Sequence, residues 1–249
     1  MNKESEKLGL TSTHFITPHG LDEKEHYTTA YELALISDYA LNIEKIKEVV
    51  NTKTYTVYIN EKPKTINNTN ELLGNLNGVN GVKTGFTNGA GRCLVTSVDR
   101  DSFNIICVVL GADTKKIRTR DSIRLIEYIY STYEQVNISE LVEREFINWS
   151  NINKNRIEVY KAQNTYVQIA LENKKINTYP IKKEEIKDIQ INIENKELYF
   201  EAPIYKGTEV GQLNVYLKDK KILTLKIFIG NEIKRKDWQD YFKECLQVI

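Results

Sequence analysis

Three short strand candidates follow one another in the middle of the chain, and this run constrains the fold more than any other feature. Residues 81–87, 93–98 and 103–110 have the length and β-branched content typical of strands. A tight antiparallel turn, residues 99–102, joins the last two runs. After these strand candidates the spacing of hydrophobic residues changes: across 117–130 they recur at helical spacing. We therefore expect an antiparallel meander with an amphipathic helix over one face.

The chain ahead of the meander combines a helix, a strand and a connection. Residues 27–50 have apolar side chains near helical spacing, and Thr28 or Thr29 suits the N-cap. Residues 54–59 are typical of a strand. Residues 67–81 are rich in Asn and Gly, which predicts a long surface connection.

The second half of the chain is dominated by short β-rich runs, from about residue 142 to 229. The strand candidates are residues 157–160, 166–171, 198–202 and 213–217. This pattern predicts a separate all-β domain, a small sandwich. The C-terminal segment from Trp238 onward has apolar residues at i, i+3, i+4, i+7, i+8 and i+11, which predicts an amphipathic helix. Such a helix suits packing on a neighbouring surface and attachment to a membrane surface equally well.

The expected fold class is α+β in three segments. The 249 residues, 41% of them hydrophobic, suffice for two modest cores. Residues 1–140 form the domain with the antiparallel sheet and its helices, residues 141–230 the β-rich domain, and residues 231–249 the amphipathic helix.

Composition excludes several classes of partner. Thirty-five Lys and Arg against 34 Asp and Glu leave a formal net charge of +1, so no nucleic-acid partner is expected. The N-terminus lacks the pattern of a secretory signal, and no stretch reaches the roughly 18 apolar residues that a membrane span needs. The cysteines Cys93, Cys107 and Cys245 show no Cys-x-x-Cys spacing, and the first two are expected to be small core residues.

A Lys-Thr-Gly triplet, Lys83 to Gly85, lies in the first strand candidate of the meander. On an exposed strand it suits a peptide that ends in a carboxylate. The ammonium of Lys83 supplies positive charge, the hydroxyl of Thr84 can donate to the carboxylate, and Gly85 lacks the Cβ that would block a close backbone approach. An edge strand would also let the peptide add as a further strand.

Several stretches resemble, in order and spacing, the D-alanyl-D-alanine carboxypeptidases among the low-molecular-mass penicillin-binding proteins. They are residues 8–15, 17–22, 28–34, 70–73, 81–85, 90–95 and 108–112, with Arg118 and, more weakly, 202–204, 206–207 and 210–211. The resemblance covers nearly the whole chain. It implies that residues 1–140 are part of a β-lactamase/transpeptidase-like domain and that residues 141–230 are that family's second domain.

The resemblance also implies catalytic roles. Lys83, Thr84 and Gly85 correspond to the third motif of the family, which faces a Ser-x-x-Lys motif and a Ser-x-Asn motif. The backbone N–H of Phe86 would form half of an oxyanion hole. The implied reaction is a serine-type carboxypeptidase step of peptidoglycan biosynthesis and remodelling, which removes the terminal D-alanine through an acyl-enzyme and needs no cofactor.

Substrate contacts follow from the same resemblance. Arg118 would bind the terminal carboxylate of a peptidoglycan stem peptide ending in D-Ala-D-Ala, and His19 would border the site. β-Lactams would be partners of the intact enzyme. The implied location is extracytoplasmic, at the outer face of the cytoplasmic membrane, with residues 231–249 as a possible contact to that membrane surface.

The departures from the family pattern concern the nucleophile. No serine in the chain has a lysine three positions later, so no nucleophile can be assigned. The only Ser-x-Asn begins at Ser102, after Lys83, which is the wrong order for the family. We therefore expect the chain to be the C-terminal portion of a carboxypeptidase, through an internal start, a split gene, a frameshift or an artificial truncation, and to be inactive alone.

Two other interpretations concern function and metal binding. A non-catalytic peptidoglycan-binding or interaction module would keep the substrate strand without the chemistry. The histidines His14, His19 and His26 lie close together in the sequence, but their spacing fits no zinc motif, so no metal site is expected.

Overall fold

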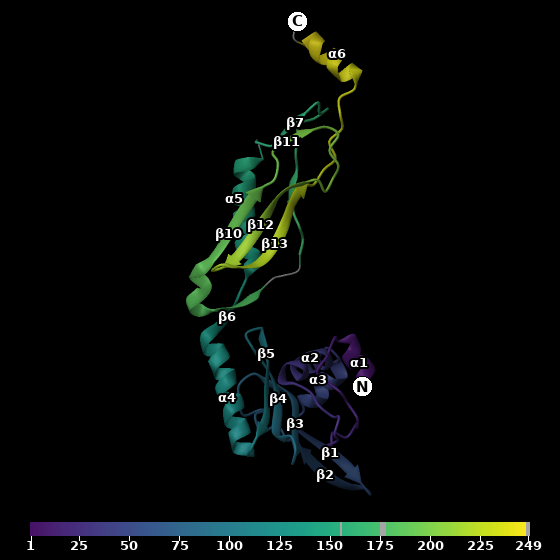
Figure 1. Cartoon of the computed structure of the whole chain (residues 1–249), viewed down its shortest axis with the longest axis vertical. Coiled ribbons are helices and arrows are strands. Elements are labelled where there is room, and N and C mark those ends of the chain that lie inside the picture. The colour runs from purple at the N-terminus through teal and green to yellow at the C-terminus, as the bar shows by residue number, and fades with distance from the viewer. Residues whose placement is uncertain (155, 175–177, 248–249) are drawn as a thin grey trace. The chain divides into compact units, whose positions relative to one another are not determined.

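The computed structural model describes residues 1–154, 156–174 and 178–247. The chain divides into two compact units, Met1–Thr132 and Tyr133–Ile249 (Figure 1). Each unit contains its own cluster of buried hydrophobic residues. The domain boundaries at residues 140 and 230 stay a prediction.

The sheet of unit 1 is the antiparallel meander that the sequence predicts. It consists of β3 (Val79–Thr87), β4 (Gly91–Arg100) and β5 (Phe103–Ala112) in the order β3-β4-β5. Asp101 and Ser102 have φ angles of 51° and 65°, as in the two-residue turns whose twist matches that of paired strands. In the described part of the chain, β3 therefore lies at an edge of the sheet.

Three helices precede the sheet: α1 (Asn2–Lys7), α2 (Ala30–Leu41) and α3 (Glu44–Val50). Thr29, one of the two predicted caps, accepts a hydrogen bond from the backbone N–H of Glu32 at 3.2 Å. The expectation of one continuous helix over 27–50 is wrong, because the helix breaks after residue 41. There the side chain of Asn42 donates to the backbone carbonyl of Asp38 at 3.0 Å, a local bond that competes with helix continuation.

Helices lie on both sides of this sheet (Figure 1). The predicted amphipathic helix is α4 (Lys115–Thr132), and its Ile126 is buried in one cluster with Leu94 of β4. Because successive strand residues point to opposite faces, Ser97 of β4 lies on the other side. It lines a hollow there together with Ala34 of α2.

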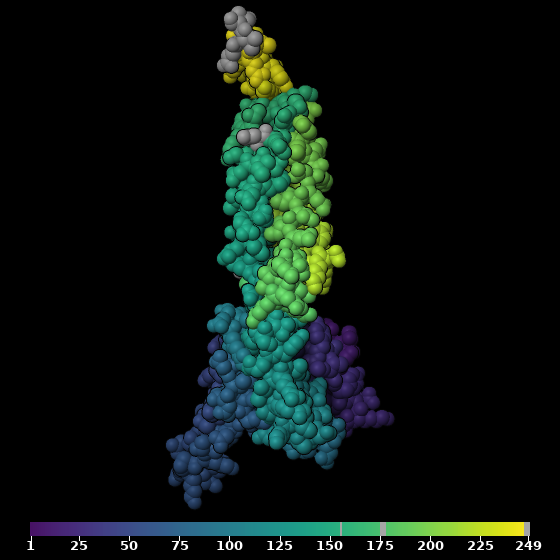
Figure 2. Space-filling model, turned by 90° about the vertical axis from the view of Figure 1, so that its left-hand side faces the viewer, coloured from purple at the N-terminus to yellow at the C-terminus, as the bar shows by residue number. Residues whose placement is uncertain are grey.

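An exposed hairpin follows α3. Its strands are β1 (Thr54–Ile59) and β2 (Lys62–Asn67), joined through Asn60 and Glu61, whose φ angles are 47° and 64°. Every residue of β2 is exposed, and Figure 2 shows the hairpin in dark blue, projecting from the rest of unit 1. The sequence predicts β1 but misses β2.

The segment between β2 and β3 packs into unit 1, so the expected surface connection over 67–81 is wrong in part. Leu72 and Leu73 are buried in the core cluster. The buried side chain of Asn70 donates to the carbonyl of Gly81 at 2.9 Å and accepts from the N–H of Leu72 at 3.1 Å. Asn side chains make such local backbone bonds readily, so an Asn-rich stretch can be well ordered.

Unit 2 begins with β6 (Tyr133–Val136) and α5 (Ile138–Asn153). This helix corrects the expectation that only strands follow residue 142. Its apolar residues recur at helical spacing and belong to the hydrophobic cluster of unit 2: Ile138, Val142, Phe146 and Trp149. The helical period among charged neighbours is the signal that the strand interpretation missed.

The described strands of unit 2 form one four-stranded antiparallel sheet and two small pairs. The sheet has the order β10 (Ile189–Asn195), β12 (Glu209–Leu217), β13 (Lys220–Ile229) and β8 (Ile169–Leu171). The pairs are β6 with β9 (Tyr179–Lys182) and β7 (Glu158–Tyr160) with β11 (Tyr199–Glu201), and the 3₁₀ helix η1 (Lys183–Asp188) leads from β9 to β10.

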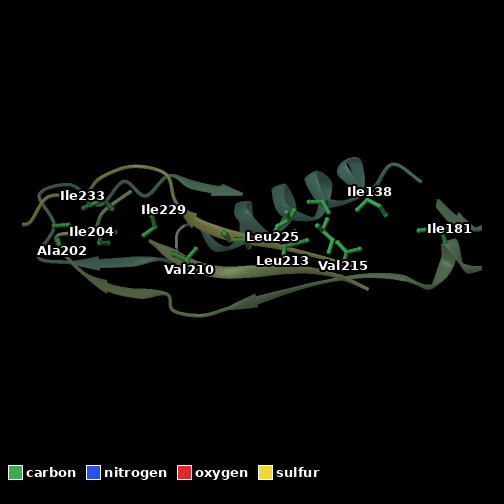
Figure 3. Packing of buried hydrophobic residues seen from close by; sticks show 14 residues of the cluster. Ile138, Ile181, Ala202, Ile204, Val210, Leu213, Val215, Leu225, Ile229 and Ile233 are labelled. Carbon is green, nitrogen blue, oxygen red and sulfur yellow. The ribbon is translucent and has the colours of Figure 1, made fainter. Parts of the chain in front are cut away.

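The core of unit 2 lies between α5 and the large sheet. Figure 3 shows Leu213, Val215 and Leu225 of the sheet on the side of α5, and Val215 lies nearest to Ile138 of that helix. The predicted C-terminal helix is present as α6 (Trp238–Gln247), and it exposes Trp238, Tyr241, Phe242 and Leu246. None of the helices in the described residues is both long enough and apolar enough to span a membrane.

Candidate functional site

A cleft of about 680 Å³ in unit 1 brings together several parts of the chain that are separated in sequence. Its walls are β3, a loop that precedes α2, and the start of α4 with the segment after β2. The lining residues are Pro18, His19, Gly20, Leu21, Asn68, Thr69, Glu71, Lys83, Thr84, Gly85, Phe86, Arg92, Lys115 and Arg118. All six residues that the sequence singles out, His19, Lys83, Thr84, Gly85, Phe86 and Arg118, therefore line one cleft.

The wall formed by β3 presents the Lys-Thr-Gly triplet. Lys83 is exposed, and its ammonium donates to the backbone carbonyl of Thr84. The hydroxyls of Thr84 and Thr69 are hydrogen-bonded at 2.6 Å. A Cβ on Gly85 would meet only the Cβ of Cys93, at 3.6 Å, which is an ordinary contact. The packing of the chain itself therefore does not require glycine at position 85.

The loop that carries His19 is tied to the end of β3 by Asp22. One carboxylate oxygen of Asp22 accepts from the hydroxyl of Thr87 at 2.5 Å, and the other accepts from the N–H of Gly89 at 3.2 Å. His19 is exposed, and its Nδ1 accepts from the N–H of Leu21 at 3.2 Å. Sequence reasoning placed Asp22 in a motif but missed this tether.

A buried carboxylate holds the start of the same loop. Glu32 of α2 accepts from the backbone N–H groups of Thr11 and Ser12, each at 2.9 Å, and from the hydroxyl of Thr13. The hydrogen bond from Thr13 and those from the two backbone amides outweigh the effect of burial and lower the pKa of Glu32. The loop is thus anchored at Glu32 and again at Asp22.

The opposite wall contains an ion pair between Arg118 and Glu71. Nη2 of Arg118 lies 2.8 and 2.7 Å from the two carboxylate oxygens of Glu71, and the hydroxyl of Thr119 also donates to Glu71. Lys115 Nζ lies 3.6 Å from the same carboxylate. Burial raises the pKa of Glu71, but the hydrogen bonds from Thr119, its own backbone amide and Arg118 outweigh it, so the pKa is lowered. Residues 70–73 belong to the stretches that resemble the family, but sequence reasoning assigned Glu71 no role, because its partners Arg118 and Thr119 are distant in sequence.

Phe86 and Arg92 form a stacked pair at the edge of the cleft. The guanidinium carbon of Arg92 lies 3.6 Å from the centre of the Phe86 ring, within the range of a cation–π contact. Phe86 is 52% exposed. Apart from Glu71, the charged groups that line the cleft are cationic: Lys83, Arg92, Lys115 and Arg118. The cleft therefore suits an anionic ligand.

The remaining histidines do not line the cleft, whereas Cys93 borders it, since its carbonyl lies 3.5 Å from Nη1 of Arg118. His14 makes a hydrogen bond of 2.7 Å to the carbonyl of Glu25, and His26 contacts Thr17 at 3.5 Å. In the residues that the structure describes, no cluster of His, Cys, Asp and Glu could hold a metal ion. Burial raises the pKa of Cys107 to about 11, which suits a small core residue.

Comparison with known proteins identifies the family. Residues 1–114 match the family model for D-alanyl-D-alanine carboxypeptidase, and residues 150–235 match the model for the penicillin-binding protein 5 C-terminal domain. Over 226 residues the chain is 34% identical to the D-alanyl-D-alanine carboxypeptidase DacF of Bacillus subtilis. The aligned region covers 90% of this chain and 54% of that protein. Over 241 residues it is 31% identical to DacA of Escherichia coli, covering 94% and 55% respectively.

A solved structure shares the fold. Penicillin binding protein 5 from Haemophilus influenzae superposes with a TM-score of 0.66 at 24% identity, over 94% of this chain and 64% of that one. The chain belongs to the D-alanyl-D-alanine carboxypeptidase family, as its sequence motifs predict, and it has the mixed helix and strand fold of these proteins. It spans about half the length of the curated relatives it matches.

Proposed function

We propose that this chain supplies the substrate-binding part of a serine-type D-Ala-D-Ala carboxypeptidase of peptidoglycan biosynthesis and remodelling, and that it does not catalyse the reaction alone. The observation that carries the proposal is the cleft in which the edge strand β3 faces the cationic start of α4. A stem peptide ending in D-Ala-D-Ala offers this cleft an extended backbone and a terminal carboxylate.

The residues of β3 suit such a ligand. An edge strand has unpaired backbone groups that can accept a peptide as an additional strand. Gly85 supports the proposal, because the packing of the chain itself leaves room for a Cβ at this position. The reason for a glycine is then the close approach of a ligand backbone from the cleft. Lys83 supplies positive charge, Thr84 a hydroxyl, and the N–H of Phe86 half of an oxyanion hole, with Arg118 and His19 on the surrounding walls.

In the proposed reaction, a serine hydroxyl attacks the carbonyl carbon of the penultimate D-alanine and the new ester bond forms. The amide C–N bond breaks, and the leaving nitrogen takes a proton as D-alanine departs. Water then hydrolyses the ester and releases the shortened peptide. The chain has no Ser-x-x-Lys to provide this serine, so turnover requires a nucleophile from outside the sequence given. β-Lactams would acylate the same serine.

Labelling with a fluorescent penicillin tests the proposal. The chain as given is expected to show no covalent band after denaturing electrophoresis. A protein that joins this chain to an upstream coding region with Ser-x-x-Lys and Ser-x-Asn motifs should label and release D-alanine from a D-Ala-D-Ala peptide. Replacing the serine of that motif by alanine is the control and should abolish both. Labelling of the chain alone would contradict the proposal.

A non-catalytic peptidoglycan-binding module is the second candidate, and the combination of a formed cleft with no Ser-x-x-Lys motif favours it. The two candidates differ in what precedes Met1 in the gene. A coding region with both serine motifs supports the enzyme, whereas a genuine start site with binding of a D-Ala-D-Ala peptide supports the module.

The proposal extends to an extracytoplasmic location, at the outer face of the cytoplasmic membrane. It rests on the family and on α6, which exposes Trp238, Tyr241 and Phe242 beside basic residues. The full chain should bind vesicles that contain anionic lipid, and Trp238→Ala should weaken this binding without changing the melting of the protein. Equal binding by both proteins would exclude this helix as the membrane contact.

A further inference from the structure

Glu71 is the single carboxylate among the described residues that line the cleft, and four cationic side chains line the same cleft. A ligand that ends in a carboxylate must therefore enter a site that already contains one. The neighbours of Glu71 hold it in place: Asn70 is hydrogen-bonded to Gly81 at 2.9 Å, and Leu72 is buried in the core. The carboxylate of Glu71 is thus a fixed feature of the wall.

The donors around Glu71 form an arrangement that would suit any carboxylate. Arg118 Nη2 lies within 2.8 Å of both oxygens, the hydroxyl of Thr119 donates to one of them, and Lys115 Nζ approaches the other at 3.6 Å. All three donors come from the first turns of α4, where the helix dipole also favours negative charge. The best anion-binding position of the cleft is therefore filled from within the chain.

Arg118 depends on this pairing. Its side chain is 4% exposed. Nη1 makes only a long contact, 3.5 Å, to the carbonyl of Cys93, and Nε has no hydrogen-bond partner in the described residues. A buried guanidinium that loses its main acceptor is costly, so any carboxylate that replaced Glu71 would be bound firmly.

We propose that Glu71 is a built-in competitor for the terminal carboxylate of the ligand and thereby sets how strongly the cleft selects a free carboxylate over an uncharged end. With Glu71 in place, Arg118 balances the charge of Glu71, and the ligand carboxylate is left to Thr84 and Lys83. The native chain then discriminates only weakly between a peptide acid and its amide. This inference rests on the proposed function, because it takes a D-Ala-D-Ala peptide as the ligand.

Calorimetric titration of the full chain tests the inference with two probes, diacetyl-L-lysyl-D-alanyl-D-alanine and the same peptide as its C-terminal amide. Glu71→Gln should bind the acid at least about tenfold more tightly than the native chain does, since one charge-assisted pair becomes free, while the Kd for the amide stays the same. The matched control is Glu127→Gln. Glu127 belongs to α4, the same helix as Arg118, and it pairs with Arg100 of β4 at 2.6 Å. It does not line the cleft, so this change should leave both Kd values unchanged.

A second variant keeps the inference testable if Glu71→Gln binds nothing because its fold is weakened. Glu71→Ala should melt at a lower temperature than the native chain, and acetate should restore much of the loss where chloride at equal ionic strength does not. An equal effect of acetate on the native chain and on Glu71→Ala would overturn the inference.

The result also separates this inference from the proposed function. If the native chain binds the peptide acid and Glu71→Gln binds it no more tightly, Glu71 is not a competitor although the proposed function stands. If neither protein binds either peptide and acetate restores nothing, both proposals fail.

Discussion

Among the residues that the structure describes, unit 2 packs fourteen buried hydrophobic residues into one cluster, whereas the cluster of unit 1 contains seven. Unit 1 instead buries the charged side chains of Glu32 and Arg118, each with hydrogen-bonding partners. Among the described residues of unit 2, the buried polar side chains are two amides, Asn153 and Asn214. Charges that leave water need specific partners, while hydrocarbon needs only close packing.

This difference separates two sources of stability. Unit 2 depends on apolar area and shape, which respond little to pH or salt. Unit 1 depends in part on the ionised carboxylates of Glu32 and Glu71, and Glu71 also lines its cleft. We therefore expect the two units to respond differently to the same kind of perturbation.

The largest expected effect is truncation of a fully buried leucine in either core. Leu213→Ala should lower the free energy of unfolding of unit 2 by about 2–5 kcal/mol, because the cavity cannot fully collapse. Calorimetry of the full chain should show its transition moving while that of unit 1 stays in place. Leu94→Ala is the reciprocal change and should move only the transition of unit 1. Both transitions moving together for either variant would remove the distinction between the units.

Breaking the Arg118 pair should cost unit 1 about 3 kcal/mol, because Arg118→Met leaves Glu71 without its main donor in a partly buried site. Chemical denaturation measures the loss. Arg100→Met serves as the control, since its partner Glu127 is 51% exposed and the expected loss is at most about 1 kcal/mol. Equal losses for the two variants would mean that burial of the pair does not matter.

Acid should affect unit 1 in a way that salt does not remove. The pKa of Glu71 is lower in the folded chain than its ordinary value of 4.5, so its contribution is fully present above that value and is lost as pH falls through the lowered one. The charged groups nearest to Glu71 are the basic side chains of Arg118 and Lys115, and Lys83 lines the same cleft. Glu201 of unit 2 also has a lowered pKa, but its pair with Lys161 is exposed and is screened by salt.

Thermal melts between pH 6 and 3 at low and high salt measure this difference. With added salt, the acid sensitivity of unit 2 should shrink, and that of unit 1 should persist. Glu71→Gln should reduce the pH dependence of unit 1, and the part that comes from Glu32, whose pKa is also lowered, should remain. If salt suppressed the acid sensitivity of both units equally, the buried pair would be no different from a surface pair.

The smallest expected change in stability comes from Gly85→Ala. The new Cβ makes only an ordinary contact with Cys93, so the free energy of unfolding of unit 1 should change by no more than about 0.5 kcal/mol. Thermal melts measure this change. Binding of a D-Ala-D-Ala peptide should nevertheless fall, because the methyl group projects where the ligand backbone approaches. Gly207→Ala in unit 2 is unsuitable as a control, since its φ of 94° disfavours alanine. Gly230→Ala in unit 2 is the matched control: its new Cβ would also make only ordinary contacts, at 3.5 Å, and it should leave peptide binding unchanged.

The parts of the fold with a clear period could be predicted from the sequence. The meander over 81–110 and the helix over 117–130 follow from alternating and helical spacing, and both are present. The helix α5 was missed, because its apolar residues from Ile138 to Trp149 lie among charged ones and next to β-rich sequence. The break after residue 41 depends on one side-chain hydrogen bond of Asn42, which periodicity does not report.

The site could be predicted only where a motif marks it. The family resemblance assigns Lys83 and Arg118 to the same site, and both residues line one cleft. Glu71 and Asp22 act through contacts with residues 47 and 65 positions away, and no local pattern reports contacts at that separation. Charge balance inside a cleft is a property of the folded chain, so it was accessible only from the structure.

The hairpin of β1 and β2 has a practical consequence. Because β2 is exposed along its whole length and the turn at Asn60 and Glu61 projects from unit 1, a short tag or a spectroscopic label inserted there would not disturb the core. A tag or label in this turn would allow ligand occupancy to be followed on an immobilised or labelled protein without a tag at either terminus.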